Sequence, residues 1–244
     1  MRSMFELSDP KVAEEITKEE LLEIVRGSMK DFQERMKAEQ KQKVRSYADL
    51  NKVAKKGQIL FTGSSLMEQF PINEIAMSAG DSRVMYNRGI GGTTTDDFIA
   101  EADTVLFDLK PSKLFINIGT NDINERPDGS DWREHLYTNY DKIMTMINER
   151  LPKCEVYVMA YYPVNPNVNP ALAAFMLKTR TNETVTEVNA KVKELAEKHG
   201  FTYIDVNDGI RDKDGFQKAE YSKEGMHMYP SGYLAVYEQL KQFI

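Results

Sequence analysis

The 244-residue chain lacks features that define several large classes of protein. Its one cysteine, Cys154, excludes an intrachain disulfide and a cluster of thiolate metal ligands. No apolar run approaches the roughly 20 residues that a membrane-spanning helix needs. The first ten residues contain one arginine and no apolar core, so we expect no secretory signal and a cytoplasmic protein.

Positive charge is also in short supply. The chain has 32 Lys and Arg against 38 Asp and Glu, which gives a formal net charge of −6. Without a basic cluster, nucleic acid and anionic membranes are poor candidate partners. Charged residues are concentrated in residues 1–57, while the whole chain is 41% hydrophobic. That composition is enough for one large α/β domain with a sizeable core.

Residues 1–57 are predicted to form a helical extension with one long helix from about residue 18 to 43. Thr17 and Glu20 have the spacing of a capping box. Apolar residues then recur at spacings of three and four, which predicts a stripe along one face. The stripe consists of Leu22, Val25, Met29, Phe32 and Met36. We expect it to pack on the body of its own subunit. A coiled-coil or homodimer arm stays open as the alternative.

From residue 58 onwards, short apolar runs alternate with longer amphipathic stretches. The runs predict strands at 58–62, 84–87, 113–118, 155–160 and 201–206. The stretches between them predict helices at about 66–79, 94–109, 132–150, 171–199 and 231–243. This alternation predicts one domain over 58–244, a three-layer α/β/α fold with a central five-stranded parallel sheet.

Polar segments follow three of the predicted strands at their carboxyl ends. They are Gly63–Ser65, Asn87–Gly92 and Gly119–Asp122. A fourth segment, Glu224–His227, places a carboxylate three residues before a histidine. Because the carboxyl ends of parallel strands meet at one edge of a sheet, these segments can converge on one crevice. Together they offer a nucleophile, a base with an orienting carboxylate, and N–H donors for an oxyanion, which acyl transfer requires.

The four segments resemble the motif blocks of the SGNH hydrolase superfamily, the GDSL-like lipases and acylhydrolases. Here the blocks read GSSL, NRGIGG, GTND and EGMH, in the family's order. The resemblance covers about residues 58–244 and implies the flavodoxin-like SGNH hydrolase fold. Two positions depart from the family pattern, because Ser64 and Glu224 stand where the family has aspartate. We expect the first change to leave the chemistry intact. The second requires a longer side chain to reach the same imidazole nitrogen.

The resemblance implies a serine esterase that uses no metal and no organic cofactor. Ser65 is its nucleophile, His227 its general base, and Glu224 the carboxylate that orients the base. The oxyanion donors it implies are the backbone N–H groups of Ser65 and Gly92 and the side-chain amide of Asn121. A small-molecule ester is the partner that such a site predicts.

Simpler interpretations of the same residues stay open. A serine at a strand-to-helix turn often caps the helix, and Gly91 competes with its neighbour for the oxyanion role. Thr94 stands where a GxGxxG dinucleotide motif needs glycine, which argues against nucleotide binding. His135 and His199 have no partner motif, so neither is predicted to be catalytic.

Substrate signals are few. Tyr161, Tyr162 and Asn165 follow the fourth predicted strand, and with Arg180 they are predicted to contact a polar substrate. The prediction is hydrolysis of small O-acyl esters with acetyl or other short chains, including those of carbohydrates. Lysophospholipase or lipase activity on longer chains is one alternative. A non-catalytic carbohydrate- or lipid-binding module on the same fold is another, and a flavodoxin-like nucleotide binder is the weakest.

Overall fold

The computed structural model describes residues 17–244 and begins with helix α2 (Lys18–Val53). The predicted capping box is present at its start. The Thr17 backbone N–H donates to Glu20 Oε2 at 3.0 Å, and the Glu20 N–H donates to Thr17 Oγ1 at 3.2 Å. The helix continues past the predicted end near residue 43, because its last two turns bury Tyr47 and Asn51.

The predicted apolar stripe of α2 lies partly outside the described residues. The undescribed side chains are those of Leu22, Val25 and Met29. Phe32 is 55% exposed and Met36 is partly buried. The chain divides into two units between Arg45 and Ser46, within α2 itself. Packing of the stripe on the subunit, or on a second copy, therefore stays a prediction.

Five parallel strands form the predicted sheet. They are β1 (Ile59–Gly63), β2 (Met85–Asn87), β3 (Lys113–Asn117), β4 (Glu155–Met159) and β5 (Thr202–Ile204). Every strand lies within two residues of its predicted bounds at each end. The strand order is β2-β1-β3-β4-β5, with all neighbours parallel. This is the flavodoxin-like order, in which ligands bind at the carboxyl ends near the switch from β1 to β3.

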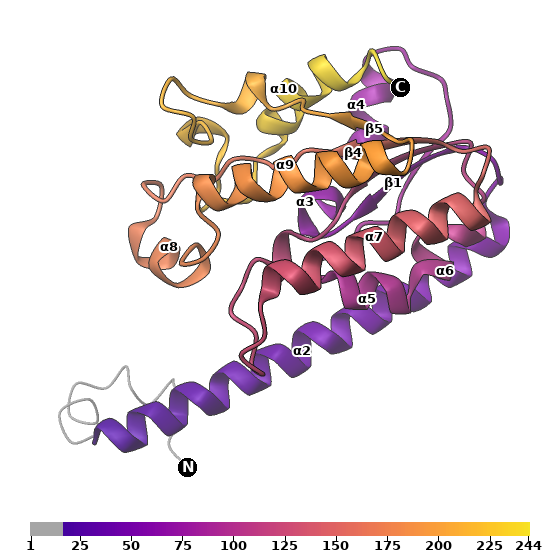
Figure 1. Cartoon of the computed structure of the whole chain (residues 1–244). Helices are drawn as coiled ribbons and strands as arrows, with labels where there is room; N and C mark the ends of the chain where they lie inside the picture. Colours follow the sequence, from indigo (N-terminus) through magenta and orange to yellow (C-terminus); the bar gives the residue numbers. More distant parts are fainter. Residues whose placement is uncertain (1–16) are drawn as a thin grey trace. The chain divides into compact units, whose positions relative to one another are not determined.

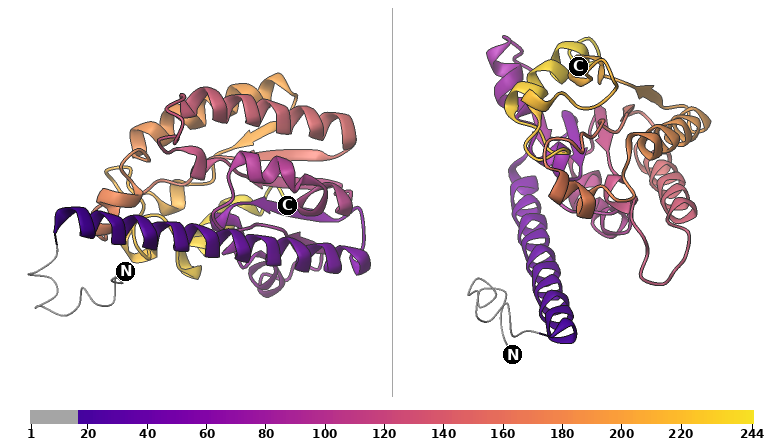
Figure 2. Two further views of the ribbon diagram at one scale, coloured as in Figure 1. Left: turned by 90° about the horizontal axis from the view of Figure 1, so that it is seen from below. Right: turned by 90° about the vertical axis from the view of Figure 1, so that its left-hand side faces the viewer.

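Helices cover both faces of the sheet (Figures 1 and 2). One face carries α3 (Ser65–Glu68), α4 (Ile72–Ser78) and α10 (Pro230–Leu240). The other carries α5 (Thr95–Ala100), α6 (Ala102–Val105), α7 (Trp132–Arg150) and α9 (Asn182–Lys198). The predicted three-layer fold is confirmed.

Three of the predicted helices are broken. The stretch 66–79 is divided into α3 and α4 at Pro71, and 94–109 is divided into α5, α6 and a short 3₁₀ turn. The stretch 171–199 is divided into α8 (Pro170–Met176) and α9. Thr181 ends the break by capping α9, since its Oγ1 accepts the Thr184 N–H at 3.2 Å.

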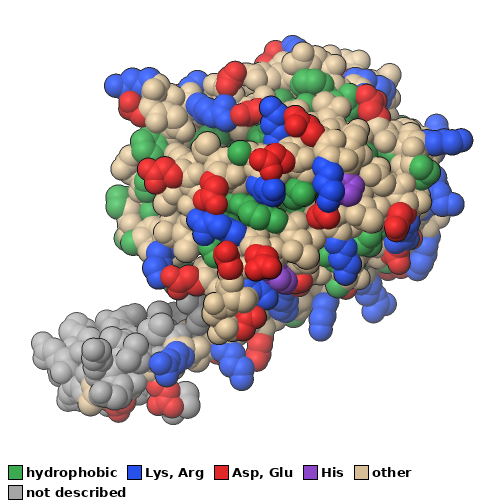
Figure 3. All heavy atoms as spheres, viewed as in Figure 1, with side chains coloured by type: hydrophobic (Ala, Val, Ile, Leu, Met, Phe, Trp, Pro, Cys, Tyr) green, Lys and Arg blue, Asp and Glu red, His purple; other side chains and the backbone are tan. Residues whose placement is uncertain are grey.

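The described surface is mixed in charge, and acidic and basic side chains are interspersed on the face shown in Figure 3. Exposed ion pairs join α7 to α9, including Arg133 with Glu187 at 2.7 Å and Lys198 with Asp141 at 2.8 Å. Pairs of this kind each contribute little to stability. Among residues 17–244 we find no helix with the length and apolar character to cross a bilayer.

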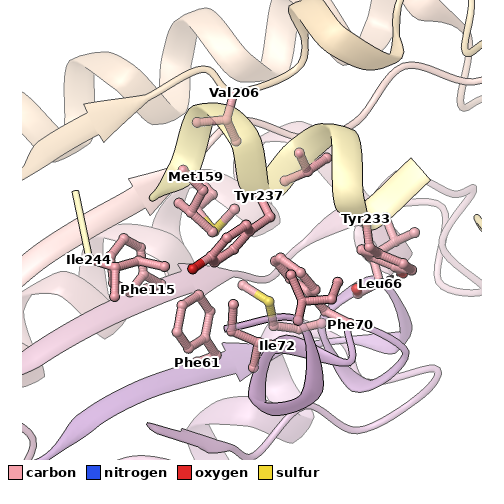
Figure 4. Packing of buried hydrophobic residues seen from close by; sticks show 14 of the residues in the cluster. Phe61, Leu66, Phe70, Ile72, Phe115, Met159, Val206, Tyr233, Tyr237 and Ile244 are labelled. Carbon is pink, nitrogen blue, oxygen red and sulfur yellow. Dashed lines mark hydrogen bonds between the residues drawn. The ribbon is translucent and has the colours of Figure 1, made fainter. Parts of the chain in front are cut away.

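Aromatic side chains fill the core between the sheet and α10 (Figure 4). Phe61, Phe115 and Tyr157 occupy paired positions on β1, β3 and β4. Their rings stack in sequence, with centroids 4.6 and 4.9 Å apart. Phe70 stacks on Tyr233 of α10 at 4.9 Å. Phe115 lies at the middle of the stack, so aromatic rings contact it on both sides, and its side chain is fully buried.

Replacing Phe115 with alanine is expected to lower the free energy of unfolding by about 3–5 kcal/mol, because a large cavity replaces a buried ring. Urea denaturation followed by circular dichroism measures the change. Phe175→Ala is the matched control, since that ring is 65% exposed and its loss should change stability by about 0.5 kcal/mol or less. Equal effects of the two substitutions would contradict the assignment of the core.

Candidate active site

Ser65 lies where β1 turns sharply into α3. Gly63, at the end of β1, has a φ of +152°, and a Cβ there would lie 1.9 Å from the Asn117 carbonyl oxygen of β3. Glycine alone tolerates this approach. The Ser64 backbone N–H donates to the same carbonyl oxygen at 3.2 Å. The turn is thereby tied to β3, and Ser65 is left partly exposed at the first turn of α3.

The side chains of Ser65, His227 and Glu224 form a continuous hydrogen-bonded chain. Ser65 Oγ lies 2.9 Å from His227 Nε2, and His227 Nδ1 lies 2.6 Å from Glu224 Oε1. With its proton on Nδ1, the ring donates a hydrogen bond to the carboxylate, which leaves Nε2 free to accept a hydrogen bond from the serine hydroxyl. Glutamate therefore reaches the imidazole nitrogen despite being longer than the family's aspartate.

A tightly bonded loop presents His227. The Gly225 N–H donates to Ser222 Oγ at 2.8 Å, and the Gly225 carbonyl oxygen accepts the Asn165 N–H at 2.7 Å. Gly225 has a φ of +108°, and a Cβ there would lie 2.5 Å from the Asn165 carbonyl oxygen. The glycine between Glu224 and His227 is thus required by close packing as well as by its backbone angle.

The turn after β2 is fastened to α3. Asn87 Nδ2 donates to the carbonyl oxygens of Met67 at 2.6 Å and Phe70 at 3.1 Å. A Cβ on Gly89 would lie 2.3 Å from the backbone nitrogen of Glu68. These contacts hold the NRGIGG segment against the helix that carries Ser65.

Gly91 and Gly92 differ in what their backbone N–H groups bind. The Gly91 N–H donates to Glu68 Oε2 at 2.7 Å. Within residues 17–244, the N–H groups of Gly92 and Ser65 make no hydrogen bond. Of the two glycines, Gly92 is therefore the one with a donor left for an oxyanion. Glu68, three residues after Ser65 on the same helix, was not singled out from the sequence.

Asn121 and Asp122 both hold the segment that follows Gly92. Asn121 Nδ2 donates to the Thr93 carbonyl oxygen at 2.9 Å, which orients the amide and leaves its second hydrogen free of that bond. The Asp122 carboxylate accepts both the backbone N–H and the hydroxyl of Thr95. Burial raises the pKa of Asp122 to about 6, although the hydrogen bonds from Thr95 act in the opposite direction.

The four residues predicted to bind substrate are all buried beside loops of the site. They are Tyr161, Tyr162, Asn165 and Arg180. The Tyr161 hydroxyl donates to the Ile118 carbonyl oxygen at 2.6 Å and lies behind Gly119, where an added Cβ would be 2.3 Å away. Asn165 Nδ2 donates to the Gln217 carbonyl oxygen at 2.7 Å. Their contact with substrate stays a prediction.

The end of α2 supports the turn after β2, which sequence reasoning missed. The Tyr47 hydroxyl donates to the Gly89 carbonyl oxygen at 2.8 Å. Arg88 Nε donates to Asn51 Oδ1 at 3.0 Å, and its guanidinium lies 4.9 Å from the centre of the Tyr47 ring. Tyr47 and Asn51 are four residues apart, so their shared helix face is the signal that could have extended the predicted helix.

The remaining histidines have carboxylate partners of their own. His135 Nε2 lies 2.7 Å from Asp96 Oδ2, and His199 Nε2 lies 2.7 Å from Asp141 Oδ1. In the part of the chain that the structure describes, no group of three or more His, Cys, Asp or Glu side chains is arranged to hold a metal ion.

Asp122→Asn is expected to stabilise the protein more at neutral pH than at acid pH. The folded state holds the Asp122 proton more tightly than the unfolded chain does, with a pKa of about 6 against an ordinary 3.8. The stabilisation that this proton gives to the folded state is complete below the ordinary pKa of 3.8 and is lost as pH rises through about 6. Urea denaturation at about pH 4 and pH 7.5 should give stability differences that diverge by up to about 3 kcal/mol. A pH-independent difference would contradict burial of the charged carboxylate.

Several solved structures have this fold. A Streptococcus pneumoniae protein, described provisionally as a platelet activating factor, is 28% identical with a TM-score of 0.78, covering 88% of this chain and 97% of that one. A GDSL-like lipase from Bacteroides thetaiotaomicron is 18% identical with a TM-score of 0.67, covering 82% and 96%. An acetylxylan esterase from Geobacillus stearothermophilus is 13% identical with a TM-score of 0.58, covering 77% and 94%.

A sequence model of the GDSL-like lipase/acylhydrolase family matches residues 73–235, about two thirds of the chain. No curated protein sequence matches with significance. The matched region contains the blocks that end in Gly92, Asp122 and His227, while the turn with Ser65 precedes it. The resemblance read from the four blocks is confirmed. The chain belongs to the GDSL-like lipase/acylhydrolase family of hydrolases.

Proposed function

We propose that the protein is a serine esterase that hydrolyses small O-acyl esters through an acyl-serine intermediate. The observation that carries the proposal is the chain of hydrogen bonds from Ser65 to His227 to Glu224, at 2.9 and 2.6 Å. A nucleophile, a base and an orienting carboxylate within hydrogen-bond reach of one another are the signature of this chemistry.

In the first step Ser65 Oγ attacks the ester carbonyl carbon while His227 Nε2 takes the hydroxyl proton. The imidazolium that forms is stabilised by Glu224, and the proton then passes from Nε2 to the leaving alcohol. In the second step a water molecule takes the place of the alcohol. His227 Nε2 removes a proton from the water as its oxygen attacks the acyl carbon. The same proton then passes to Ser65 Oγ as the acyl–serine bond breaks, which releases the acid and restores the serine hydroxyl.

The negative charge of the tetrahedral intermediate requires donors beside Ser65. The backbone N–H groups of Ser65 and Gly92 make no hydrogen bond to any of residues 17–244. The amide of Asn121 is oriented by the Thr93 carbonyl. Each such donor typically contributes about 2.7–4 kcal/mol to stabilising the transition state.

Short acyl chains suit the apolar surroundings of the site. A small cluster next to His227 consists of Val164, Ala173, Leu177 and Met226, with Met176 packed against it. All four are buried, so these side chains pack against one another and are not themselves a surface for a long acyl chain. Acetylxylan esterases are among the proteins with this fold, which supports acetyl esters of carbohydrates as candidate substrates.

The test is a series of 4-nitrophenyl esters from acetyl to decanoyl, with acetylated sugars beside it. We expect turnover to be fastest from acetyl to butyryl, and a fluorophosphonate probe to label Ser65. Ser65→Ala should abolish both the turnover of the esters and the labelling by the probe. Ser64→Ala is the matched control, because the Ser64 hydroxyl is buried and without a partner in the described residues. Ligand binding with hydrolysis unchanged by Ser65→Ala would favour the binding-module alternative, and a preference for long chains would favour the lipase alternative.

Glu224→Ala and Glu224→Gln are each expected to lower kcat by a factor of about 10²–10⁴, since loss of the orienting carboxylate cost about 10⁴ in a serine protease. Neither substitute balances the charge on His227. Glu224→Asp should retain activity because it keeps a carboxylate. Steady-state kinetics measure the effect, with Glu220→Gln, an exposed site in the same loop, as control. Near-normal kcat in Glu224→Ala alongside an inactive His227→Ala would indicate a Ser-His dyad.

A further inference from the structure

A buried guanidinium lies beside the site with one edge unused. Arg180 is only 7% exposed, and its Nη1 donates to the thioether sulfur of Met226 at 2.6 Å. Its Nε is enclosed and has no acceptor in the described part of the chain. Its Nη2 also makes no hydrogen bond to any described residue, but unlike Nε it is not fully buried. Nη2 is therefore the donor that keeps contact with solvent.

The surroundings of Arg180 provide no counter-charge by contact. Within residues 17–244 no carboxylate is hydrogen-bonded or ion-paired to it. Its one acceptor, a thioether, is weak. Burial lowers the pKa of Arg180 to about 10, so the group remains cationic at neutral pH. A buried cation without an anionic partner is strongly unfavourable, and an apolar side chain of similar size would fit this cluster at less cost in stability.

Arg180 interacts with residues adjacent in sequence to His227 and to Asn121. Met226, which accepts its hydrogen bond, immediately precedes His227. Asp122, whose charge acts on Arg180, immediately follows Asn121, but its carboxylate is occupied by Thr95. The guanidinium is therefore bonded to the loop that carries the base, and the charge of a residue in the loop with the oxyanion amide acts on it.

We propose that Arg180 binds an anionic group of the substrate, a carboxylate or a phosphate, through the donor at Nη2. A guanidinium N–H makes a charge-assisted hydrogen bond to an oxygen of either anion. This inference rests on the proposed esterase function and narrows its substrate class to anionic esters. Because the chain has a net charge of −6, Arg180 supplies an attraction for anions that the protein's overall charge does not.

The experiment compares three acetyl esters in the wild type and in Arg180→Met. They are neutral 4-nitrophenyl acetate, 3-acetoxybenzoate with a carboxylate, and 1-acetylglycerol 3-phosphate with a phosphate. We expect Arg180→Met to lower kcat/KM about ten- to hundredfold for one anionic ester, mainly by raising KM. The neutral ester should change by less than about threefold on the same scale. The ester that responds identifies the anion.

Arg133→Met is the matched control, because Arg133 is an exposed arginine paired with Glu187, and it should leave all three reactions unchanged. If Arg180→Met does not fold, Arg180→Lys replaces it in the comparison. Lysine keeps the positive charge without the guanidinium group, and we expect it to retain part of the preference for the anionic ester. Equal losses on neutral and anionic esters in either variant would overturn the proposal.

Binding measured without turnover separates this inference from the esterase proposal. Isothermal titration calorimetry of the two anionic esters uses Ser65→Ala, with and without a substitution at Arg180. We expect affinity for one ester to fall about tenfold or more when Arg180 is replaced. Unchanged affinity contradicts the inference even if the enzyme is an esterase. Failure of the wild type to hydrolyse any ester contradicts the esterase proposal, whereas this binding comparison still reports on Arg180.

Discussion

The close approach of β1 to β3 at their carboxyl ends is the constraint on which the site depends. The Asn117 carbonyl oxygen occupies the space where any side chain on Gly63 would lie, and it accepts the Ser64 N–H. The Asn117 side chain donates to the Ala160 carbonyl oxygen at 3.0 Å. One residue thus ties the end of β3 to β1 on one side and to the end of β4 on the other. The turn that presents Ser65 is therefore bonded directly to β3.

Two charged residues beside the candidate site, Asp122 and Arg180, are buried at a cost in stability. Burial raises the pKa of Asp122, so ionisation of its carboxyl group at neutral pH lowers the free energy of unfolding. Arg180 is a buried cation with a thioether as its acceptor. Asp122 immediately follows Asn121, and Arg180 is bonded to Met226, which immediately precedes His227. Burial of charge at these positions contrasts with the apolar core around Phe115. Unfavourable groups of this kind concentrate at functional sites, where the gain is made when substrate binds.

The sequence predicted the sheet well because its signals are local. Strand β3, for example, is centred on the continuous apolar run 114–116, which can be recognised without long-range information. The helices were predicted less well. The stretch 66–79 is divided at Pro71, and the stretch 171–199 is divided before Thr181, which caps α9. Apolar periodicity alone indicated neither division. The end of α2 was missed because Tyr47 and Asn51 are stabilised by Gly89 and Arg88, which are distant in sequence.

The four blocks located the candidate site but not the directions of the side chains around it. Tyr161 follows β4 as predicted, yet its hydroxyl points behind Gly119 because the Ile118 carbonyl accepts it there. Side-chain direction at a strand end depends on which neighbour offers a partner, and the sequence alone does not contain that partner's position. The choice between Gly91 and Gly92 required the same information, since it depends on the Glu68 carboxylate.

Glu224 stands where the family has aspartate, and it reaches the His227 ring because of where its carboxylate is held. Glu224 Oε1 accepts hydrogen bonds from both the Nδ1–H and the backbone N–H of His227, at 2.6 and 2.9 Å. The second bond folds the longer side chain back on its own loop, and Gly225 allows that loop to close. The extra methylene is thereby taken up within the turn, and the oxygen lies at hydrogen-bond distance from the ring. Position of the carboxylate, rather than identity of the residue, is what orientation of the base requires.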